Sequence, residues 1–199
     1  SALRSPAASS TESSTASSKS CGGIPDPAYR RELIRYALLS DIHGNLEALT
    51  AVLTSVSACG ADGLLCLGDV VGYGADPGPC VERVRQEAVA VVSGNHDAGA
   101  VGRLDLDWFN PFAKAAALWT AEQLCGDHRA YLSSLPLVAR IDEATLVHAS
   151  PRVPEDWDYL ISARDGFEVF PFFRTRLCFV GHSHRPGVWI EGPDGVRFE

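Results

Sequence analysis

The chain has 199 residues, which is enough for one well-packed domain and a tail but hardly for two full domains. Its apolar content of 46% is sufficient for a hydrophobic core, and no stretch approaches the roughly 20 consecutive apolar residues that cross a bilayer. The N-terminal region also lacks the apolar segment of a secretory signal. We therefore expect a cytoplasmic protein with no membrane partner.

The charge distribution and the cysteine content limit the kinds of binding partner and the chemistry of the thiols. Residues 1–35 carry five basic and three acidic side chains, whereas the remainder carries 12 basic against 22 acidic. Because this body lacks the basic stripe of a nucleic-acid-binding face, a stable nucleic-acid complex is not expected. Bound divalent cations would reverse the charge locally, so a phosphate substrate is not excluded. The six cysteines show no C-x-x-C spacing, which favours reduced structural thiols over disulfides or a zinc knuckle.

The N-terminal segment is rich in serine, alanine and threonine. Such a composition buries too little apolar surface to offset the entropy of ordering. We expect residues 1–28 to form a flexible tail and residues 29–199 to form the folded domain. An organelle transit peptide is a weaker interpretation of the same composition.

Short apolar runs then alternate with helical patterns along the chain. The runs cover residues 36–39, 64–67, 89–92, 145–147 and 177–180. Continuously apolar runs of this length are typical of buried strands in α/β proteins. A helix is predicted from Leu46 until Gly60 stops it, and a second, after Asp76-Pro77, is predicted over Val81 to Ala88.

The second half of the chain contains further helix signals and a closing hairpin. Asn110 and Pro111 predict a helix that runs to about Cys125, with Phe112, Ala116 and Trp119 on one face. Asp127 is expected to cap a short helix after it. Residues 188–190 and 196–198, separated by a Gly-Pro-Asp-Gly turn, predict a β-hairpin.

Side chains able to bind metal follow each of the five apolar runs. In order they are Asp41, His43, Asp69, Asn95, His148, His182 and His184. The carboxyl ends of strands in α/β sheets are where ligands bind, so these clusters should converge on one site. Mixed imidazole and carboxylate ligation suits manganese, iron, zinc, cobalt or nickel. Seven ligands are too many for one such ion, which favours two ions that share a bridging carboxylate and lie about 3.5–4 Å apart. Such a pair of ions would make hydroxide available at neutral pH.

The chain resembles the calcineurin-like metallophosphoesterases over about residues 35–186. Five motifs match in order, namely Asp41-Ile42-His43, Gly68-Asp69, Gly94-Asn95-His96-Asp97, His148 and Gly181-His182-Ser183-His184. The resemblance implies an α/β fold in which two mixed β-sheets pack as a sandwich flanked by helices. It also implies two divalent transition-metal ions per chain, with manganese as the first choice.

The resemblance assigns roles to individual residues. One metal would be held by Asp41, His43, Asp69 and His184. The other would be held by Asp69, Asn95, His148 and His182, with Asp69 as the bridge. His96, oriented by Asp97, would stabilise the transition state or protonate the leaving oxygen.

Within the family, the loop after Gly68-Asp69 resembles the small prokaryotic phosphodiesterase-like branch. Ser/Thr phosphatases and diadenosine tetraphosphate hydrolases have an arginine in this loop and generally a glutamate in place of Asp97. Two features depart from the branch. The chain ends at Glu199, short of the usual C-terminal stretch, and Pro171 interrupts a predicted helix.

We therefore predict metal-dependent hydrolysis of phosphate esters, with phosphodiesters first and a small molecule or nucleotide as substrate. A phosphomonoester or phosphoprotein phosphatase is one alternative, and a non-catalytic interaction scaffold is another. Arg103, Arg152 and Arg185 are candidate phosphate clamps or ordinary surface arginines. Tyr73, Trp157 and Phe167 are candidates for a rim that stacks a base, or for simple packing. The sequence leaves the oligomeric state open.

Overall fold

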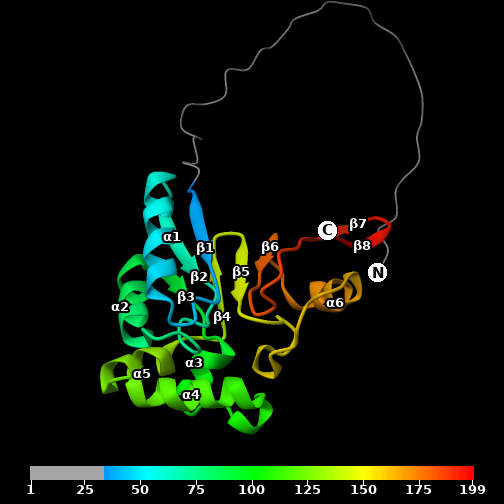
Figure 1. Ribbon diagram of the computed structural model, residues 1–199. Helices are drawn as coiled ribbons and strands as arrows, with labels where there is room; N and C mark the ends of the chain where they lie inside the picture. Colours follow the sequence, from blue (N-terminus) through cyan, green and yellow to red (C-terminus); the bar gives the residue numbers. More distant parts are fainter. Residues whose placement is uncertain (1–33) are drawn as a thin grey trace, which may run out of the picture. The chain divides into compact units, whose positions relative to one another are not determined.

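Strands β1 (Tyr36–Leu39), β2 (Gly63–Cys66) and β3 (Ala88–Val91) form a parallel sheet in that order. The computed structural model describes residues 34–199, which form one unit (Figure 1). The expected tail and its boundary at residues 28 and 29 therefore lie outside the described residues. The parallel pairing explains why these strands are continuously apolar, since helices and a second sheet cover their two faces.

Two helices connect the strands of this sheet. Helix α1 (Leu46–Ala58) buries Leu49 and Leu53, and helix α2 (Pro77–Glu87) follows β2. Both pack on the same core cluster as β2. Gly60, predicted to stop α1, lies two residues after its end with φ of 63°, a conformation that glycine adopts without strain.

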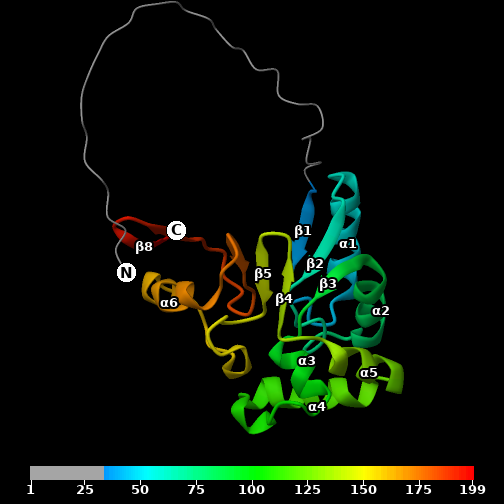
Figure 2. The same cartoon turned by 180° about the vertical axis from the view of Figure 1, so that it is seen from behind.

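The second sheet is mixed and lies on the side of the first sheet opposite to helices α1 and α2 (Figures 1 and 2). Strand β4 (Val138–Ile141) is antiparallel to β5 (Ala144–Val147), and β5 is parallel to β6 (Leu177–Phe179). Leu65, Val92 and Leu146 belong to one apolar cluster that joins the two sheets. Strands β7 (Trp189–Gly192) and β8 (Gly195–Phe198) form the predicted hairpin as a separate third sheet. The described residues thus form an α/β fold with several sheets, of which only the second is mixed, and not the two mixed sheets expected.

Four more helices complete the described part of the chain. They are α3 (Asn95–Ala100), α4 (Pro111–Gln123), α5 (Gly126–Ser134) and α6 (Ala163–Val169). Three single 3₁₀ turns, η2 (Leu106–Trp108), η3 (Pro154–Asp156) and η4 (Phe170–Phe172), lie in the loops. Pro171 lies in η4, so helix α6 ends before it, as the interruption predicted. No helix of this described part is long and apolar enough to cross a membrane.

Two details of the helix predictions need correction. Asn110 caps α4 as predicted, because its Oδ1 accepts from two backbone N–H groups, but Phe112 is 85% exposed and the buried positions of α4 are Ala113, Ala117 and Thr120. Asp127 lies in the first turn of α5, after the cap residue, and its carboxylate pairs with Arg85 at 2.8 Å.

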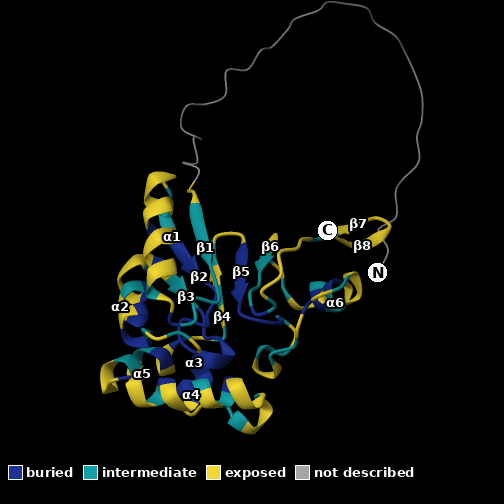
Figure 3. Cartoon of the chain, in the orientation of Figure 1, coloured by how far each residue is buried: buried dark blue, intermediate teal, exposed yellow. Residues whose placement is uncertain are grey.

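Burial is concentrated where the strands meet the polar loops (Figure 3). Strands β2 and β5 are almost fully buried, and so are the loops that follow them. The cysteines within the described residues are free, in agreement with reduced thiols. The core therefore supplies a rigid frame from which the loops after β1, β2, β3, β5 and β6 project.

Candidate metal centre

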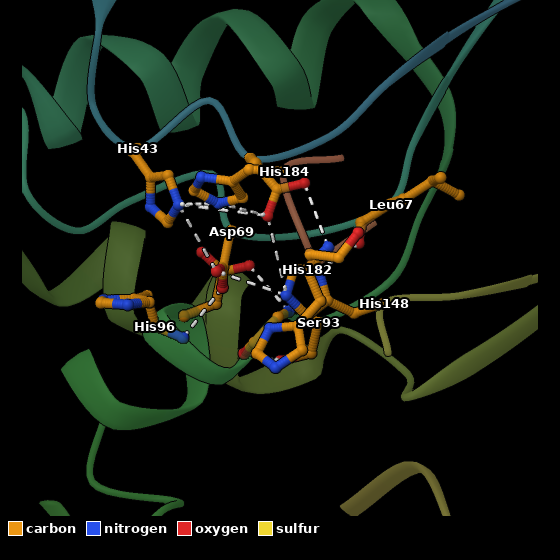
Figure 4. A network of polar contacts seen from close by, with 12 residues as sticks. His43, Leu67, Asp69, Ser93, His96, His148, His182 and His184 are labelled. Atoms are coloured by element: carbon orange, nitrogen blue, oxygen red, sulfur yellow. Dashed lines mark hydrogen bonds and ion pairs between the residues drawn. The ribbon is translucent and has the colours of Figure 1, made fainter. Parts of the chain in front are cut away.

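The loops after five strands bring imidazole and carboxylate groups into one cluster (Figure 4). His184 Nε2 lies 3.2 Å from His43 Nε2 and 3.2 Å from Asp41 Oδ1. His148 Nε2 lies 3.3 Å from Asp69 Oδ2, and His43 Nε2 lies 3.7 Å from the same oxygen. Residues that are more than 100 positions apart in the sequence thus present donor atoms to one another.

The donor atoms divide into groups that match the two predicted metal sites. Asp41, His43 and His184 form one group, and Asp69, His148 and His182 form another, each with ligand atoms within 4.8 Å of one another. A third grouping joins His43 and Asp69 to His96. Asp69 belongs to the second group, and its Oδ2 also lies 3.7 Å from His43 Nε2 of the first. Asn95 lies at the start of α3 and lines the same cavity as His96 and His182.

Several of these donor atoms are buried without a hydrogen-bond partner. They are Asp41 Oδ1, Asn95 Oδ1, His148 Nε2 and His182 Nε2. The contacts of Asp41 Oδ1 with His184 at 3.2 Å and of His148 Nε2 with Asp69 at 3.3 Å lack hydrogen-bond geometry. A buried polar atom left unsatisfied costs about 1–3 kcal/mol, and native proteins rarely leave several in one place. All four belong to predicted metal ligands, so the residues present fit a metal centre that would satisfy them.

Backbone carbonyls orient the imidazoles of the cluster. His148 Nδ1 donates to the Leu67 carbonyl at 2.7 Å, and His43 Nδ1 donates to the Val71 carbonyl at 3.2 Å. A hydrogen bond at Nδ1 leaves Nε2 free to ligate, which is the usual arrangement around metal-binding histidines. The loop after β2, which carries both Leu67 and Val71, therefore also sets which ring nitrogen faces the cluster.

The backbone of the cluster adopts strained conformations. Positive φ angles of 50–64° occur at Asp41, His43, Asp69, His182 and His184. Non-glycine residues in this region cost of order 1–3 kcal/mol and tend to gather at functional sites. Five of the seven predicted ligands are strained in this way, which indicates that the fold holds their side chains in place at an energetic cost.

Burial and mutual interaction shift the protonation of these groups. Burial opposes ionisation of Asp69, but the imidazoles of His148, His96 and His43 outweigh it and hold the pKa of Asp69 well below its usual range. Burial likewise opposes the cationic form of His148, yet Asp69 raises the pKa of His148 to about 9. For His182, burial and the nearby His148 lower the pKa to about 4. The centre therefore has an anionic Asp69 surrounded by imidazoles.

His96 lies beside the cluster, and the neighbouring Asp97 binds the backbone around it. Asp97 Oδ1 accepts from the backbone N–H of Val71 at 3.1 Å, and Oδ2 accepts from that of Gly94 at 3.0 Å. The backbone N–H of His96 donates to Asp69 Oδ1 at 2.8 Å. Both carboxylate oxygens of Asp97 thus bind backbone, and among the described residues no hydrogen bond joins Asp97 to the His96 ring. Orientation of His96 by Asp97 stays a prediction.

The His96 ring is held by aromatic neighbours. Its centroid lies 4.5 Å from that of Tyr73, 4.9 Å from Phe109 and 5.0 Å from His43. Its Nδ1 has no hydrogen-bond partner, and burial lowers the pKa of His96 to about 4. Gly72, with φ of 96°, faces this ring, and a Cβ at that position would approach His96 Nδ1 to 2.6 Å. The absence of a side chain at Gly72 is therefore required for the ring's position.

A cavity of about 650 Å³ opens beside the cluster. Tyr73 and Trp157, predicted as rim residues, line it, whereas Phe167 does not. Sequence reasoning missed Trp108, Phe109 and Tyr159. The sequence feature that could have identified them as cavity residues is that they are aromatic residues in loops beside the motifs.

The three arginines considered as phosphate clamps lie outside the cavity wall. The Arg152 guanidinium binds Asp158 at 2.7 Å and Glu168 at 3.2 Å. Arg103 donates to backbone carbonyls, and Arg185 is exposed. For Arg103 and Arg152 the interpretation as ordinary structural arginines fits these contacts.

Known proteins are similar to this chain in sequence and in fold. A metallophosphoesterase from Sphaerobacter thermophilus is 47% identical, with a TM-score of 0.69 over 79% of this chain and 63% of that one. An uncharacterized protein of Methanocaldococcus jannaschii is 43% identical over 156 residues, which are 76% of this chain and 63% of the relative. A hypothetical protein of Pyrococcus horikoshii OT3, 22% identical, shares the fold with a TM-score of 0.68 over 83% of this chain and 75% of that one. The chain thus spans less than two thirds of the length of the first two relatives.

The signature of a known domain covers nearly all of the described residues. The calcineurin-like phosphoesterase superfamily domain matches residues 34–198, from two residues before β1 to the end of β8. This range contains all the predicted ligands and His96. The chain belongs to the calcineurin-like phosphoesterase superfamily.

Proposed function

We propose that this chain is a metal-dependent phosphoesterase domain that hydrolyses phosphate esters, phosphodiesters first. The observation that carries the proposal is the set of buried donor atoms without partners that surround Asp69. A protein that used this fold only as an interaction scaffold would have no reason to keep strained, unsatisfied donors in one place. Family membership supports the hydrolase class, and the substrate is our inference.

Each predicted ligand has a place in the proposed centre. Asp41, His43, Asp69 and His184 would hold one divalent ion. Asp69, Asn95, His148 and His182 would hold the other. Two such ions, when bound, supply Lewis acidity towards the phosphoryl oxygens and a nucleophile derived from water at neutral pH. Manganese is our first choice, with iron, zinc, cobalt or nickel as alternatives, because the ligands mix imidazole with carboxylate.

His96 is the residue proposed to act on the leaving group. It lines the cavity beside Asn95, and its ring has a nitrogen without a partner. From there it would donate a hydrogen bond or a proton to the departing oxygen, where negative charge develops. Tyr73 and Phe109 hold the ring at a fixed angle, which limits the entropy lost when the donor is positioned.

The charge of the cavity wall favours diesters over monoesters. The lining residues contain three carboxylates and neither lysine nor arginine. A diester carries one negative charge on its phosphate and a monoester up to two, so the wall repels a monoester more strongly. The phosphomonoesterase alternative therefore comes second.

The test combines metal content with turnover. We expect the purified protein to bind two equivalents of manganese by elemental analysis and to hydrolyse bis(p-nitrophenyl) phosphate faster than p-nitrophenyl phosphate. Asp69→Asn should lose at least one equivalent and nearly all turnover, because it removes the carboxylate between the two groups of ligands. Asp194→Asn, in the exposed turn of the β7–β8 hairpin, is the matched control and should retain both.

The possible outcomes separate the alternatives. Full turnover by protein verified to be metal-free would overturn the proposal. Stoichiometric metal without turnover of any ester would favour the scaffold, and faster monoester hydrolysis would favour a phosphatase.

A further inference from the structure

The cavity beside His96 has aromatic walls contributed by three separate segments. They are Tyr73 after β2, Trp108 and Phe109 after α3, and Trp157 and Tyr159 after β5. Trp108 is 84% exposed, Tyr159 60% and Tyr73 51%. Single exposed aromatic residues are common on protein surfaces, but several around one hollow are typical of a binding site.

Two of these aromatic side chains connect the cavity to the metal centre. The ring of Tyr159 stacks on that of His182, with centroids 4.1 Å apart and planes 18° apart. The ring of Tyr73 lies 4.9 Å from that of His43. Tyr73 and Trp157 also have positive φ angles of 61° and 57°, a costly conformation for bulky side chains. A group bound between these rings would therefore lie next to the reacting phosphate.

The charge of the cavity limits what that group can be. Glu155, Asp156 and Asp158 line it, and no lysine or arginine does. Asp158 is paired with Arg152, but Glu155 and Asp156 have no ion pair with any residue that the structure describes. A second phosphate or carboxylate in this cavity would meet carboxylates and find no cation.

We infer that the cavity binds the organic group of the ester as a planar aromatic ring that carries no further anionic group, such as the base of a nucleoside. This inference rests on the proposed function and names the substrate class for the same site. Base stacking on aromatic side chains is tolerant of ring identity and worth about 5–100-fold in affinity per ring. A volume of about 650 Å³ lies within the range of cavities that hold small organic ligands.

The first experiment compares two esters with the same p-nitrophenolate leaving group, thymidine 5′-(p-nitrophenyl phosphate) and methyl p-nitrophenyl phosphate. The wild type should prefer the thymidine ester in kcat/KM by at least tenfold. Trp108→Ala should reduce that preference by about 5–100-fold, mainly through KM, because a stacking surface is lost. Trp119→Ala, which replaces an exposed tryptophan of α4 outside the cavity, is the matched control and should leave the preference unchanged. An unchanged preference in Trp108→Ala would overturn the inference.

A second experiment tests the charge. Adding a 3′-phosphate to the thymidine ester should raise KM by at least tenfold, and the double variant Glu155→Gln and Asp156→Asn should reverse most of that penalty. No penalty in the wild type would contradict the inference. Preference for the p-nitrophenyl ester of phosphocholine over the thymidine ester would overturn it too, because the cavity would then be an aromatic cage for a cation.

Binding separates this inference from the proposed reaction. The probe is the phosphonate analogue of adenosine monophosphate, which cannot be hydrolysed, and methylphosphonate is its control. Of the two compounds, only the adenosine compound should quench the tryptophan fluorescence of the metal-loaded wild type. The Trp108→Ala variant should lose most of this quenching. Hydrolysis of neither ester would overturn the proposed function, whereas absence of quenching would overturn the aromatic cavity whether or not hydrolysis occurs.

Discussion

Residues of the centre are constrained more by their neighbours than by their own conformational preferences. Asp69 has a positive φ, is almost fully buried, and still remains ionised because imidazoles surround it. Strain and desolvation at one residue are thus offset by interactions at others. Substitutions of residues around Asp69 should therefore act through the positions of neighbouring side chains as well as through the chemistry of the side chain that is changed.

Gly72 gives a clean test of geometry at a single residue. Gly72→Ala should lower turnover at least tenfold while retaining bound metal, because the new methyl group would contact His96 Nδ1 and displace the ring. Gly102→Ala is the matched control, since Gly102 also has a positive φ (76°) but nothing lies within 4 Å of the added methyl group. Both variants bear the strain of positive φ, so melting temperature should fall in both and turnover only in the first. Equal turnover in the two variants would contradict a role for the position of His96.

His96 itself should affect the reaction and not the metals. His96→Ala should retain two equivalents of metal and lose about 10²–10⁴-fold in turnover, the usual scale for a general acid. The loss should be smaller for an aryl ester than for an alkyl or nucleoside leaving group, because the aryl oxygen is less basic and needs less protonation. His128→Ala is the control for metal content and turnover, since this partly buried residue of α5 pairs with Glu82 and belongs neither to the ligand groups nor to the cavity wall. Loss of a metal in His96→Ala would make His96 a ligand, and an equal deficit on all leaving groups would assign it to substrate positioning.

At the scale of elements, the short helix α3 depends on Asp97. Its carboxylate joins the helix start at Gly94 to the loop at Val71, which follows β2. We expect Asp97→Asn to lower the free energy of unfolding by about 1–3 kcal/mol, because the amide supplies one acceptor for two backbone donors. Denaturant titration checks this value, and metal content should not change.

A matched variant controls for helix capping alone. Asp165 Oδ2 accepts from the backbone N–H groups of Ile161 and Ser162 at the partly exposed start of α6. Asp165→Asn should cost less than Asp97→Asn, about 0.5–2 kcal/mol, because a single oxygen of Asp165 accepts from both groups and asparagine keeps one such oxygen. If Asp97→Asn instead preserved stability and reduced turnover as much as His96→Ala, Asp97 would belong to the chemistry after all.

Elements that were predictable from the sequence are those with a strong local signal. Strands β1, β2, β3, β5 and β6 are continuous apolar runs, and the cap of α4 is encoded by Asn110 and Pro111. Strand β4 was missed because its residues are only half-buried, and its register depends on pairing with β5. The hydrogen-bond partners of Asp97 could not be predicted from the sequence either. A carboxylate can bind a histidine ring or a backbone N–H group, and only the fold decides which of them lies within reach. The convergence of the candidate ligands was predictable because strand ends converge whatever the details of packing.

Across the whole molecule, the centre joins segments from both larger sheets. His43 follows β1, Asp69 follows β2, and His148 and His182 follow β5 and β6. A metal that binds these residues therefore ties the two sheets together and binds the folded chain far better than the unfolded one. Metal binding and stability should be linked.

This linkage predicts a shift in melting temperature. Manganese at about 1,000 times its dissociation constant should add about 4 kcal/mol to the free energy of unfolding, which corresponds to roughly 10 °C for a chain of this size. Calcium at the same concentration should shift the melting temperature little, because calcium prefers oxygen ligands and the centre is rich in imidazole. Differential scanning calorimetry on the wild type, Asp69→Asn and the control Asp194→Asn measures the effect. The shift should vanish or shrink by more than half in Asp69→Asn and persist in Asp194→Asn. An equal shift with calcium, or a full shift in Asp69→Asn, would mean that the stabilising ion binds elsewhere than between these two groups of ligands.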